Sequence, residues 1–396
     1  MPGPEDYMNY DSSDVFVMAK NKDVEGLIGI LKYSKNKNAV KQAIFALGEI
    51  KDKKAVEPLV ELMLEIKPIA IILAAIRALG DMESNEAIEP LIYVMLKNRS
   101  TTLEAVRSLG KIKDGRAIKT LSMLMNDEAE DLDVRKETAE ALGKIATEEA
   151  IHSLIAALNE LGDTVLEVLK EVGEPAVMPL IAVLSGGNEP IIWEVSTILG
   201  EIRDKRAVKP LITLLLDESK YDSKKGGYVA VALGRIGDTG AVEPLIELAS
   251  KHIEDMLTCM SVRALGDIGD HRAVDALIAI LDDERTIECS HLRLETCWAL
   301  GKIRDVRAIE SLIRILGDTR NNLASIQNVQ DAAALALVEL NDDRIELPLL
   351  RYFKKQLGID TRAIFQMPEY DEYGNDKHGT VLRALGKLIA RLIDKS

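Results

Sequence analysis

The chain has 396 residues, of which 47% are hydrophobic and 4% aromatic, and its formal net charge is −15 at pH 7. No stretch approaches the roughly 20 uncharged apolar residues of a membrane span, and the first residues lack the features of a secretory signal. We therefore predict no membrane insertion and a cytoplasmic location. A chain this acidic repels a phosphate backbone over most of its surface, so nucleic acid is not expected as the main partner.

The first segment, residues 1–14, carries four carboxylates and no Lys or Arg, and we expect a mobile acidic tail there. Residues 15–34 have the pattern of a degenerate helical hairpin that caps one end of the core. The apolar residues expected to cover that end are Leu27, Ile28, Ile30 and Leu31.

From residue 35 to 355 the phrase Leu-Gly-x-Ile-x-Asp-x-x-Ala-Val-x-Pro-Leu-Ile recurs at spacings of 27 to 37 residues. A period of this size is the signature of an array of supersecondary units, none of which can bury its apolar face alone. Val338 stands in the place of the Gly in the last copy. The nine glycines are Gly48, Gly80, Gly110, Gly143, Gly173, Gly200, Gly234, Gly266 and Gly301.

Two apolar stripes in each copy predict a helical hairpin. Around Gly200, residues 191–202 place apolar side chains three and four positions apart, and a second such stripe covers residues 207–215. Only a few residues join the two helices, so they must lie antiparallel. They are called the first and second helix of a repeat below.

Three positions of the phrase carry structural predictions. Gly within a helix costs roughly 1 kcal/mol relative to Ala, so its recurrence indicates close approach of a neighbouring helix. The Asp four residues later is predicted to cap the second helix, a contribution of about 1 kcal/mol. The Pro found ten residues after the Gly in several copies is expected to kink the start of that helix. The capping residues are Asp52, Asp114, Asp204, Asp238, Asp270, Asp305 and Asp342.

Residues 299–316, Ala-Leu-Gly-Lys-Ile-Arg-Asp-Val-Arg-Ala-Ile-Glu-Ser-Leu-Ile-Arg-Ile-Leu, resemble a HEAT repeat of the short type found in phycobilisome lyases. The resemblance covers about 24–352. It implies an all-α fold, a right-handed α-solenoid of about ten helical hairpins with terminal caps, in which residues 15–396 form one domain. It also implies that the second helices line the concave face, and that the protein is a scaffold or adaptor for a protein partner.

The fifth copy breaks the pattern, because only six residues separate Gly173 from Pro179. Two interpretations stay open: a variant hairpin, and a hinge within residues 162–190. Three longer connections are expected to be solvated loops along one edge of the array. They are residues 217–227, 282–291 and 318–330.

The helical period is lost over residues 356–379 and returns over 380–396, which predicts an irregular insertion followed by a closing cap helix. A loop of this length is uncommon unless it is functional or disordered. Its large side chains are therefore expected either to contact a partner or to pack back on the array. They are Phe365, Met367, Tyr370 and Tyr373.

The sequence predicts no catalysis, metal or cofactor. Deoxyhypusine hydroxylase is similar to this solenoid in scaffold and depends on His-Glu dipeptides, but none of the five histidines here precedes Glu. No G-x-x-x-x-G-K or G-x-S-x-G motif occurs. The three cysteines lack C-x-x-C spacing and are expected to be reduced thiols in or near the core: Cys259, Cys289 and Cys297. The alternative left open is a lyase-like assembly or maturation factor for a cofactor-containing enzyme complex.

Two residues after the Asp, six repeats carry a cation, and stacking aligns these cations in a row. The row can form a ladder with the Asp residues, or it can bind an acidic patch on a partner. Trp193 and Trp298 are expected to pack in the core or between helices. The cations are Lys54, Arg116, Arg206, Arg272, Arg307 and Arg344. The predicted partner-binding residues, assigned to second helices, are Tyr93, Arg116, Arg206, Arg272, Arg307, Arg314 and Arg351, together with the four large side chains of the insertion.

Overall fold

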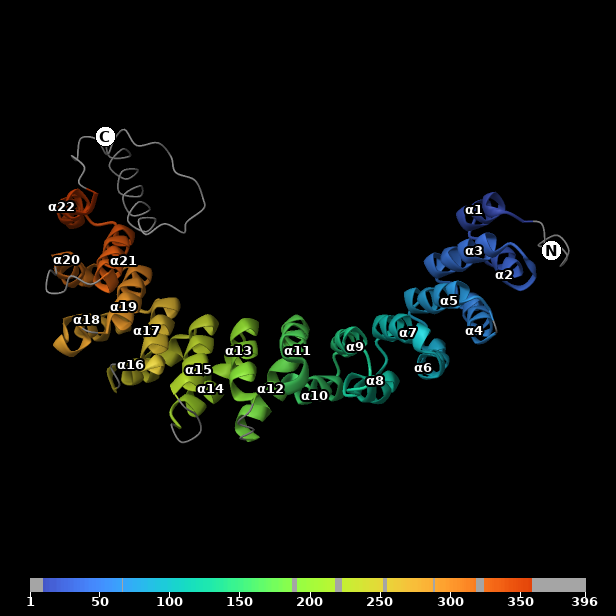
Figure 1. The fold of residues 1–396 in the computed structure, drawn as a ribbon, viewed down its shortest axis with the longest axis horizontal. Helices are drawn as coiled ribbons and strands as arrows, with labels where there is room; N and C mark the ends of the chain where they lie inside the picture. Colours follow the sequence, from blue (N-terminus) through green and yellow to red (C-terminus); the bar gives the residue numbers. More distant parts are fainter. Residues whose placement is uncertain are drawn as a thin grey trace. The chain divides into compact units, whose positions relative to one another are not determined.

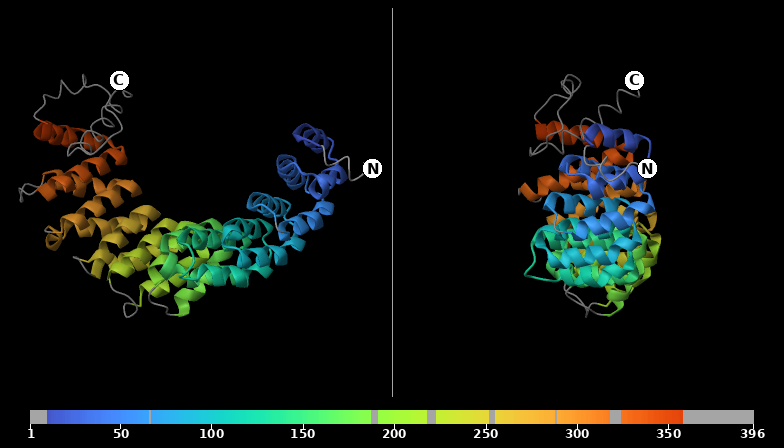
Figure 2. Two further views of the ribbon diagram at one scale, coloured as in Figure 1. Left: turned by 45° about the vertical axis from the view of Figure 1, so that its right-hand side comes forward. Right: turned by 90° about the vertical axis from the view of Figure 1, so that its right-hand side faces the viewer.

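The computed structural model describes residues 10–65, 67–186, 191–217, 223–251, 255–287, 289–317 and 324–357. The chain forms two compact units, Met1–Leu180 and Ile181–Ser396. All regular structure in the described ranges is helical, and Figures 1 and 2 show the helices stacked as hairpins within each unit. Three predicted segments lie wholly or mostly outside the described residues: the acidic tail, the insertion at 356–379 and the closing helix at 380–396.

The N-terminal unit begins with the predicted cap hairpin and continues with regular repeats. Its first helix begins at Ser12, because the Asp11 carboxylate accepts hydrogen bonds from the main chain of the first turn. Leu27 and Ile30 are fully buried, as expected of a cap. The helices are α1 (Ser12–Lys20), α2 (Val24–Tyr33), α3 (Lys37–Ile50), α4 (Val56–Leu64), α5 (Ile69–Asp81), α6 (Ile88–Lys97), α7 (Arg99–Ile112), α8 (Ile118–Met125), α9 (Leu132–Ile145), α10 (Glu148–Ala156), α11 (Leu158–Val172) and α12 (Glu174–Gly186), the last extending past the end of the unit.

The C-terminal unit repeats the same hairpin, with the odd-numbered helices as first helices and the even-numbered ones as second helices. Its helices are α13 (Ile192–Ile202), α14 (Val208–Leu215), α15 (Ser223–Ile236), α16 (Val242–Lys251), α17 (Met256–Ile268), α18 (Val274–Asp282), α19 (Ser290–Ile303), α20 (Ile309–Gly317), α21 (Ala324–Leu340) and α22 (Glu346–Leu357). The predicted connection 282–291 is only partly solvated, since it contains the 3-10 turn Glu284–Thr286 and Thr286 is buried.

A short 3-10 turn joins the two helices of most repeats; in the Gly143 copy α10 follows α9 without such a turn and Thr147 caps it. In the repeat of Asp52, the carboxylate accepts the main-chain N–H of Lys54 at 2.9 Å and caps the turn Lys53–Ala55. The α-helix proper starts at Val56, so Pro58 lies in its first turn, where the lost main-chain donor would have no helical partner. The predicted cap is confirmed. At the start of the second helix, where a kink was expected at the Pro, the structure has a 3-10 turn followed directly by the α-helix.

The recurring Gly allows successive first helices to approach to backbone contact. A Cβ atom built on Gly48 would lie 3.1 Å from Cα of Ala78, and one built on Gly266 would lie 2.6 Å from Cα of Ala299. A Cβ at this place would likewise lie against the backbone of Ser108, Ala141, Ala232, Ala264 and Ala336 in other repeats. The predicted packing reason for the Gly is therefore confirmed.

Second helices approach each other much less closely than first helices do. In Figure 1, α3, α5 and α7 lie along one side of the N-terminal unit and α4, α6 and α8 along the other; in the C-terminal unit α17, α19 and α21 lie opposite α16, α18 and α20. When the helices of one layer are closer together than those of the other layer, the stack curves so that the closely spaced layer lies on the inside. Within each unit the first helices therefore form the inner layer, which corrects the expectation that second helices do so.

The irregular fifth copy lacks both the 3-10 turn and the capping Asp. Gly173 ends α11 with φ of 68°, and Pro179 lies inside α12. Within α11, Gly162 has φ of 25° and interrupts the helix. These two conformations lie in the left-handed half of φ space, which glycine enters at little steric cost. The variant hairpin and the hinge both stay as interpretations.

Candidate functional site

The arginines that follow the recurring Asp lie in the turn of each repeat. Arg116 belongs to the 3-10 turn Gly115–Ala117 and donates from Nε and Nη2 to the Asp114 carboxylate at 3.1 and 2.9 Å. Its Nη2 also donates to the main-chain carbonyl of Asn85 in the preceding repeat at 3.0 Å. The assignment of this residue to a second helix is therefore wrong, because it precedes that helix. The same correction applies to Arg206, Arg272 and Arg307.

Bonds between neighbouring turns link repeats of the C-terminal unit in series. Arg272 and Arg307 donate to the main-chain carbonyls of Thr239 and His271, at 2.9 and 2.8 Å. The ring of His271 lies 3.0 Å from the carboxylate of Asp305. This arrangement fits the ladder interpretation of the cation row. Arg116, Arg272 and Arg307 each bind the Asp of their own turn and a main-chain carbonyl of the preceding turn, and Arg307 also pairs with Asp275 of the preceding repeat at 2.8 Å.

These contacts set the charge of the turn carboxylates. The side-chain hydrogen bond from Arg272 lowers the pKa of Asp270 to about 2, and the one from Arg307 holds the pKa of Asp305 far below its usual range. The Arg272 and Arg307 side chains remain 49% and 44% exposed. Contact with a partner therefore stays a proposal for these residues, alongside their structural role.

The remaining predicted partner-binding residues lie apart from these turns. Tyr93 on α6 is 52% exposed, and Lys97 donates to its hydroxyl at 2.8 Å. Arg314 on α20 pairs with Asp282 at 2.7 Å, and Arg351 is exposed on α22. The four large side chains of the insertion lie outside the described residues: Phe365, Met367, Tyr370 and Tyr373.

An open groove lies on the first helices of each unit. In the N-terminal unit its lining includes Gly48, Gly80 and Gly110, together with Phe45, which is 62% exposed. The charged residues that line it are Glu49, Lys51, Asp81, Glu83, Lys111, Lys113 and Lys144. Trp298 lines the corresponding groove of the C-terminal unit.

The first helices of the C-terminal unit expose four large side chains, which we call the apolar stripe. They are Trp193, Tyr228, Met256 and Trp298, on α13, α15, α17 and α19, with exposed fractions of 37, 38, 49 and 43%. The ring centroids of Trp193 and Tyr228 lie 5.5 Å apart, so Trp193 does pack between helices as expected. Neither Trp belongs to the core, however. The position of Trp298 in the repeat could have indicated its exposure, because Trp298 stands three residues before its Gly, as the exposed Phe45 does.

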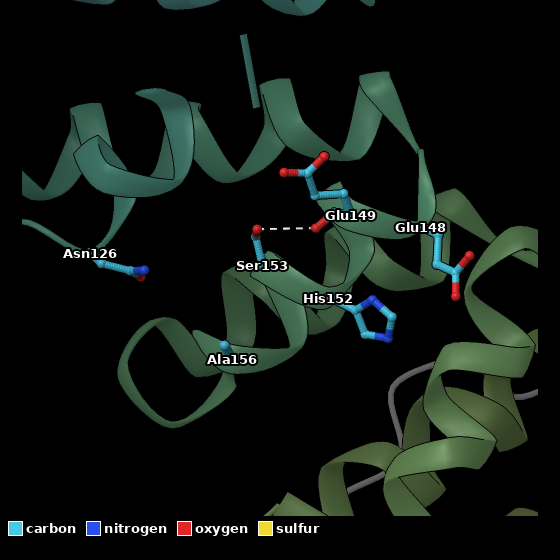
Figure 3. A pocket seen from close by; sticks show the side chains of 6 residues that line it. All are labelled: Asn126, Glu148, Glu149, His152, Ser153 and Ala156. Atoms are coloured by element: carbon cyan, nitrogen blue, oxygen red, sulfur yellow. Dashed lines mark hydrogen bonds between the residues drawn. The ribbon is translucent and has the colours of Figure 1, made fainter. Parts of the chain in front are cut away.

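An open pocket between α8 and α10 holds polar side chains, but they do not converge (Figure 3). Its lining residues are Asn126, Glu148, Glu149, His152, Ser153 and Ala156. Glu148 and His152 point to one side of α10 and Glu149 to another, while Ser153 donates to the main-chain carbonyl of Glu149 at 3.1 Å. Across the described ranges, no group of three His, Cys, Asp or Glu side chains is arranged to hold a metal ion.

The cysteines lie in or near the core, as expected. Cys259 and Cys297 are buried and Cys289 is partly buried, all as free thiols. Burial raises the pKa of Cys259 to about 11 and that of Cys297 to about 12. Because the thiolate is the nucleophilic form, these two thiols are poorly suited to nucleophilic chemistry.

Family models match much of the chain. HEAT repeats match residues 24–104, 96–167 and 222–289, and a PBS lyase HEAT-like repeat matches residues 292–318. No curated protein sequence matches the chain significantly. Among the helices of the described residues, none combines the length and apolar character needed to cross a membrane.

Solved structures of similar fold include two helical-repeat proteins. Kap95p, in a structure with RanGDP, superposes with a TM-score of 0.54 at 14% identity, over 99% of this chain and 60% of its own. Kap121p bound to Ste12p gives a TM-score of 0.54 at 14% identity, over 98% of this chain and 48% of its own. The present chain thus spans about half to three-fifths of their length. At this identity the similarity shows the fold, and it confirms the α-solenoid.

Proposed function

Because the chain belongs to the HEAT-repeat proteins, we propose that it is a non-catalytic scaffold that binds a protein partner along its first-helix layer. The apolar stripe carries this proposal. Single exposed apolar side chains are normal on a protein surface, but large exposed Trp, Tyr and Met residues on four consecutive first helices, two of them with ring centroids 5.5 Å apart, support an interface, because Trp and Tyr are enriched among residues that dominate binding energy.

The rigidity of the first-helix layer supports the same surface. Backbone contact at the glycines fixes the spacing of these helices, so the exposed side chains stand on a preorganised base. Preorganisation lowers the entropy lost on binding. The arginines of the turns, Tyr93, Arg314 and Arg351 are proposed as a second contact region.

The test begins with capture of a partner on the tagged full chain, its identification by mass spectrometry and a binding titration with the purified partner. The double substitution Trp193→Ser and Trp298→Ser should weaken binding at least about tenfold, since hot-spot residues commonly cost 2 kcal/mol or more. Met123→Ser is the matched control, because Met123 is 67% exposed on the second helix α8. Loss of binding in Tyr93→Ser with full binding in the Trp variant would instead place the site on the second helices.

We keep one alternative proposal, an assembly or maturation factor for a cofactor-containing, multi-subunit enzyme complex; the PBS lyase HEAT-like match at residues 292–318 concerns the scaffold that both roles share. The two roles differ in the state of the client protein. A scaffold holds mature partners in fixed stoichiometry, whereas a maturation factor associates with a client that lacks its cofactor. Cofactor analysis of the captured client separates them, and binding that vanishes once the cofactor is loaded would overturn the scaffold proposal.

A further inference from the structure

The last two first helices of the described chain, α19 and α21, form the groove that Trp298 lines. Its volume is about 500 Å³, and Leu335 and Ala336 line it from the α21 side. Trp298 lines it from α19 and is 43% exposed. A groove of this size lies within the range of sites that hold a ligand. It therefore offers apolar contact to a large side chain from outside the array.

Two cations at this groove are paired, and a third cation nearby is not. Lys302 binds Asp267, and Arg304 binds Glu339. Arg263 on α17 is exposed, and its side chain forms no hydrogen bond or ion pair with any residue that the structure describes. A carboxylate that approaches Arg263 would thus gain a charged hydrogen bond without breaking an existing pair.

Arg263 lies beside the face of α19 that carries Trp298. It stands three residues before its Gly, as Arg77 does, and Arg77 reaches Glu104 of the following repeat. Burial raises the pKa of Glu295, and the charge of Arg263 opposes that rise, so the two side chains are near each other. Glu295 precedes Trp298 by three residues and shares its helix face. Because Glu295 is only 4% exposed, a segment on this surface would meet the guanidinium rather than that carboxylate.

The chain itself contains a segment whose chemistry matches this surface. Residues 365–376, which we call the acidic segment, contain the four large side chains of the insertion, four carboxylates and no Lys or Arg. The acidic segment lies outside the described residues. Since the formal net charge of the chain is −15, most of its surface repels such a segment, and an unpaired cation is a favourable place for it. Its carboxylates are Glu369, Asp371, Glu372 and Asp376.

The acidic segment also follows directly on the repeat that forms the groove. Tyr370 comes 13 residues after Leu357, the last residue of α22, and 13 residues can span up to about 45 Å. By comparison, α22 is about 18 Å long, and packed helices lie about 8–10 Å apart. The segment can therefore reach the groove from the end of α22. A tether of this length gives a local concentration in about the millimolar range, so even a weak contact is populated.

We propose that the acidic segment binds the groove of its own chain, with an aromatic side chain against Trp298 and a carboxylate paired with Arg263. Aromatic side chains pair favourably through offset or edge contacts. Trp298 belongs to the apolar stripe, so a bound segment covers part of the surface that we propose for the partner. The partner then has to displace the segment, which lowers the apparent affinity of the full chain. This consequence rests on the proposed function.

The fluorescence of Trp298 tests the contact directly. The chain has two tryptophans, so in Trp193→Phe the acrylamide quenching of fluorescence reports on Trp298 alone. In that background, the large side chains of the acidic segment are replaced together by Ser. We expect a higher quenching constant in this Ser variant than in its parent, because the segment no longer covers the ring. The replaced residues are Phe365, Met367, Tyr370 and Tyr373.

A synthetic peptide of residues 363–378, added to the Ser variant, should restore the protection of Trp298. Its Kd should lie below about 1 mM, the local concentration of the tethered segment. Arg263→Ser should weaken peptide binding by up to about fivefold, as expected for an exposed ion pair. Arg107→Ser is the matched control, since Arg107 stands at the same repeat position in the N-terminal unit, and it should leave peptide binding unchanged. Circular dichroism melts verify that each variant is folded.

Two results would overturn this inference. One is equal quenching of Trp298 in the Ser variant and its parent together with no binding of the peptide. The other is protection of Trp298 that increases with protein concentration and is accompanied by dimers in sedimentation, because the segment would then occupy the groove of a second copy.

Titration with the natural partner separates this inference from the proposed function. If both hold, the Ser variant binds the partner more tightly than the full chain does. If the acidic segment fails to bind and the Trp193→Ser, Trp298→Ser variant still loses its partner, the scaffold proposal stands alone. If that variant retains its partner, the binding surface itself has been misplaced.

Discussion

The first-helix layers of the two units have the same backbone packing and different exposed side chains. In the N-terminal unit, residues that lie three and six positions before a recurring Gly form ion pairs between repeats, such as Arg77 with Glu104. In the C-terminal unit the position three residues before the Gly holds Trp298 in one repeat, and the position six residues before it holds Tyr228 in one repeat and Glu295 in another. The comparison teaches that, within the first helices, the repeat keeps the contact between Gly and its small neighbour constant while the exposed side chains vary. The outward positions differ between the units, and the binding surface that we propose uses those positions.

The largest expected effect tests whether the two units are independent. Leu79 and Leu265 are fully buried and each precedes the Gly of its repeat, on α5 and α17. Replacing either by Ala should cost about 2–5 kcal/mol, because a cavity forms in the core. Hydrogen exchange should accelerate chiefly in the unit that carries the change, since each repeat contacts only its neighbours. Uniform acceleration across both units would contradict that expectation.

A smaller effect tests the shared backbone contact. In Gly266→Ala the new Cβ would lie 2.6 Å from the Ala299 backbone, so the helices must separate and we expect a loss of about 1–3 kcal/mol. Gly317→Ala is the control, because nothing lies within 4 Å of a Cβ there. That change should be neutral or slightly stabilising. Thermal melts of both variants measure the difference, and similar melting temperatures would remove the packing explanation for the recurring Gly.

The turn ladder provides the third test. Replacing Arg272 and Arg307 together by Ser removes two cations that join neighbouring turns. Exposed pairs contribute about 0–1 kcal/mol each, so the melting temperature should fall by a few degrees at most. Titration with the purified partner decides between the two roles of these residues: unchanged binding leaves them structural, whereas weaker binding that declines further with salt supports the second contact region.

The smallest effect is a dependence of stability on pH. The pKa of Glu295 is raised above its ordinary 4.5, so ionisation at neutral pH opposes folding, and stability increases as pH falls through the folded-state pKa toward 4.5. The pKa of Asp270 is lowered from 3.8 to about 2, so its contribution is present above pH 3.8 and is lost toward pH 2. Denaturant titrations should therefore show a stability maximum in mildly acidic solution, and Glu295→Gln should flatten its neutral side.

The sequence predicted the parts of the fold that depend on local chemistry. Gly48 and its equivalents indicated close helix contact, and Asp52 and its equivalents indicated a cap, because each effect involves atoms whose spacing the repeat defines. The fifth copy around Gly173 was recognised as irregular for the same reason.

Exposure and curvature were harder to predict. The tryptophans were expected to pack in the core or between helices because they lie within first helices, but Trp298 is 43% exposed. The turn arginines were placed on second helices because the 3-10 turn has no separate sequence period. Which layer faces inward depends on the difference in spacing between layers, and a single repeat contains no such information.

Backbone contact in the first-helix layer also has a mechanical consequence. With Gly266 already against the backbone of Ala299, that layer cannot be compressed further, whereas the second helices have room to move together or apart. Under mechanical load, the first-helix layer of a unit is therefore expected to be stiff and the second-helix layer to be compliant. If a bound partner deforms the C-terminal unit, the distances between α16, α18 and α20 should change, while the spacing of side chains on the first helices stays the same.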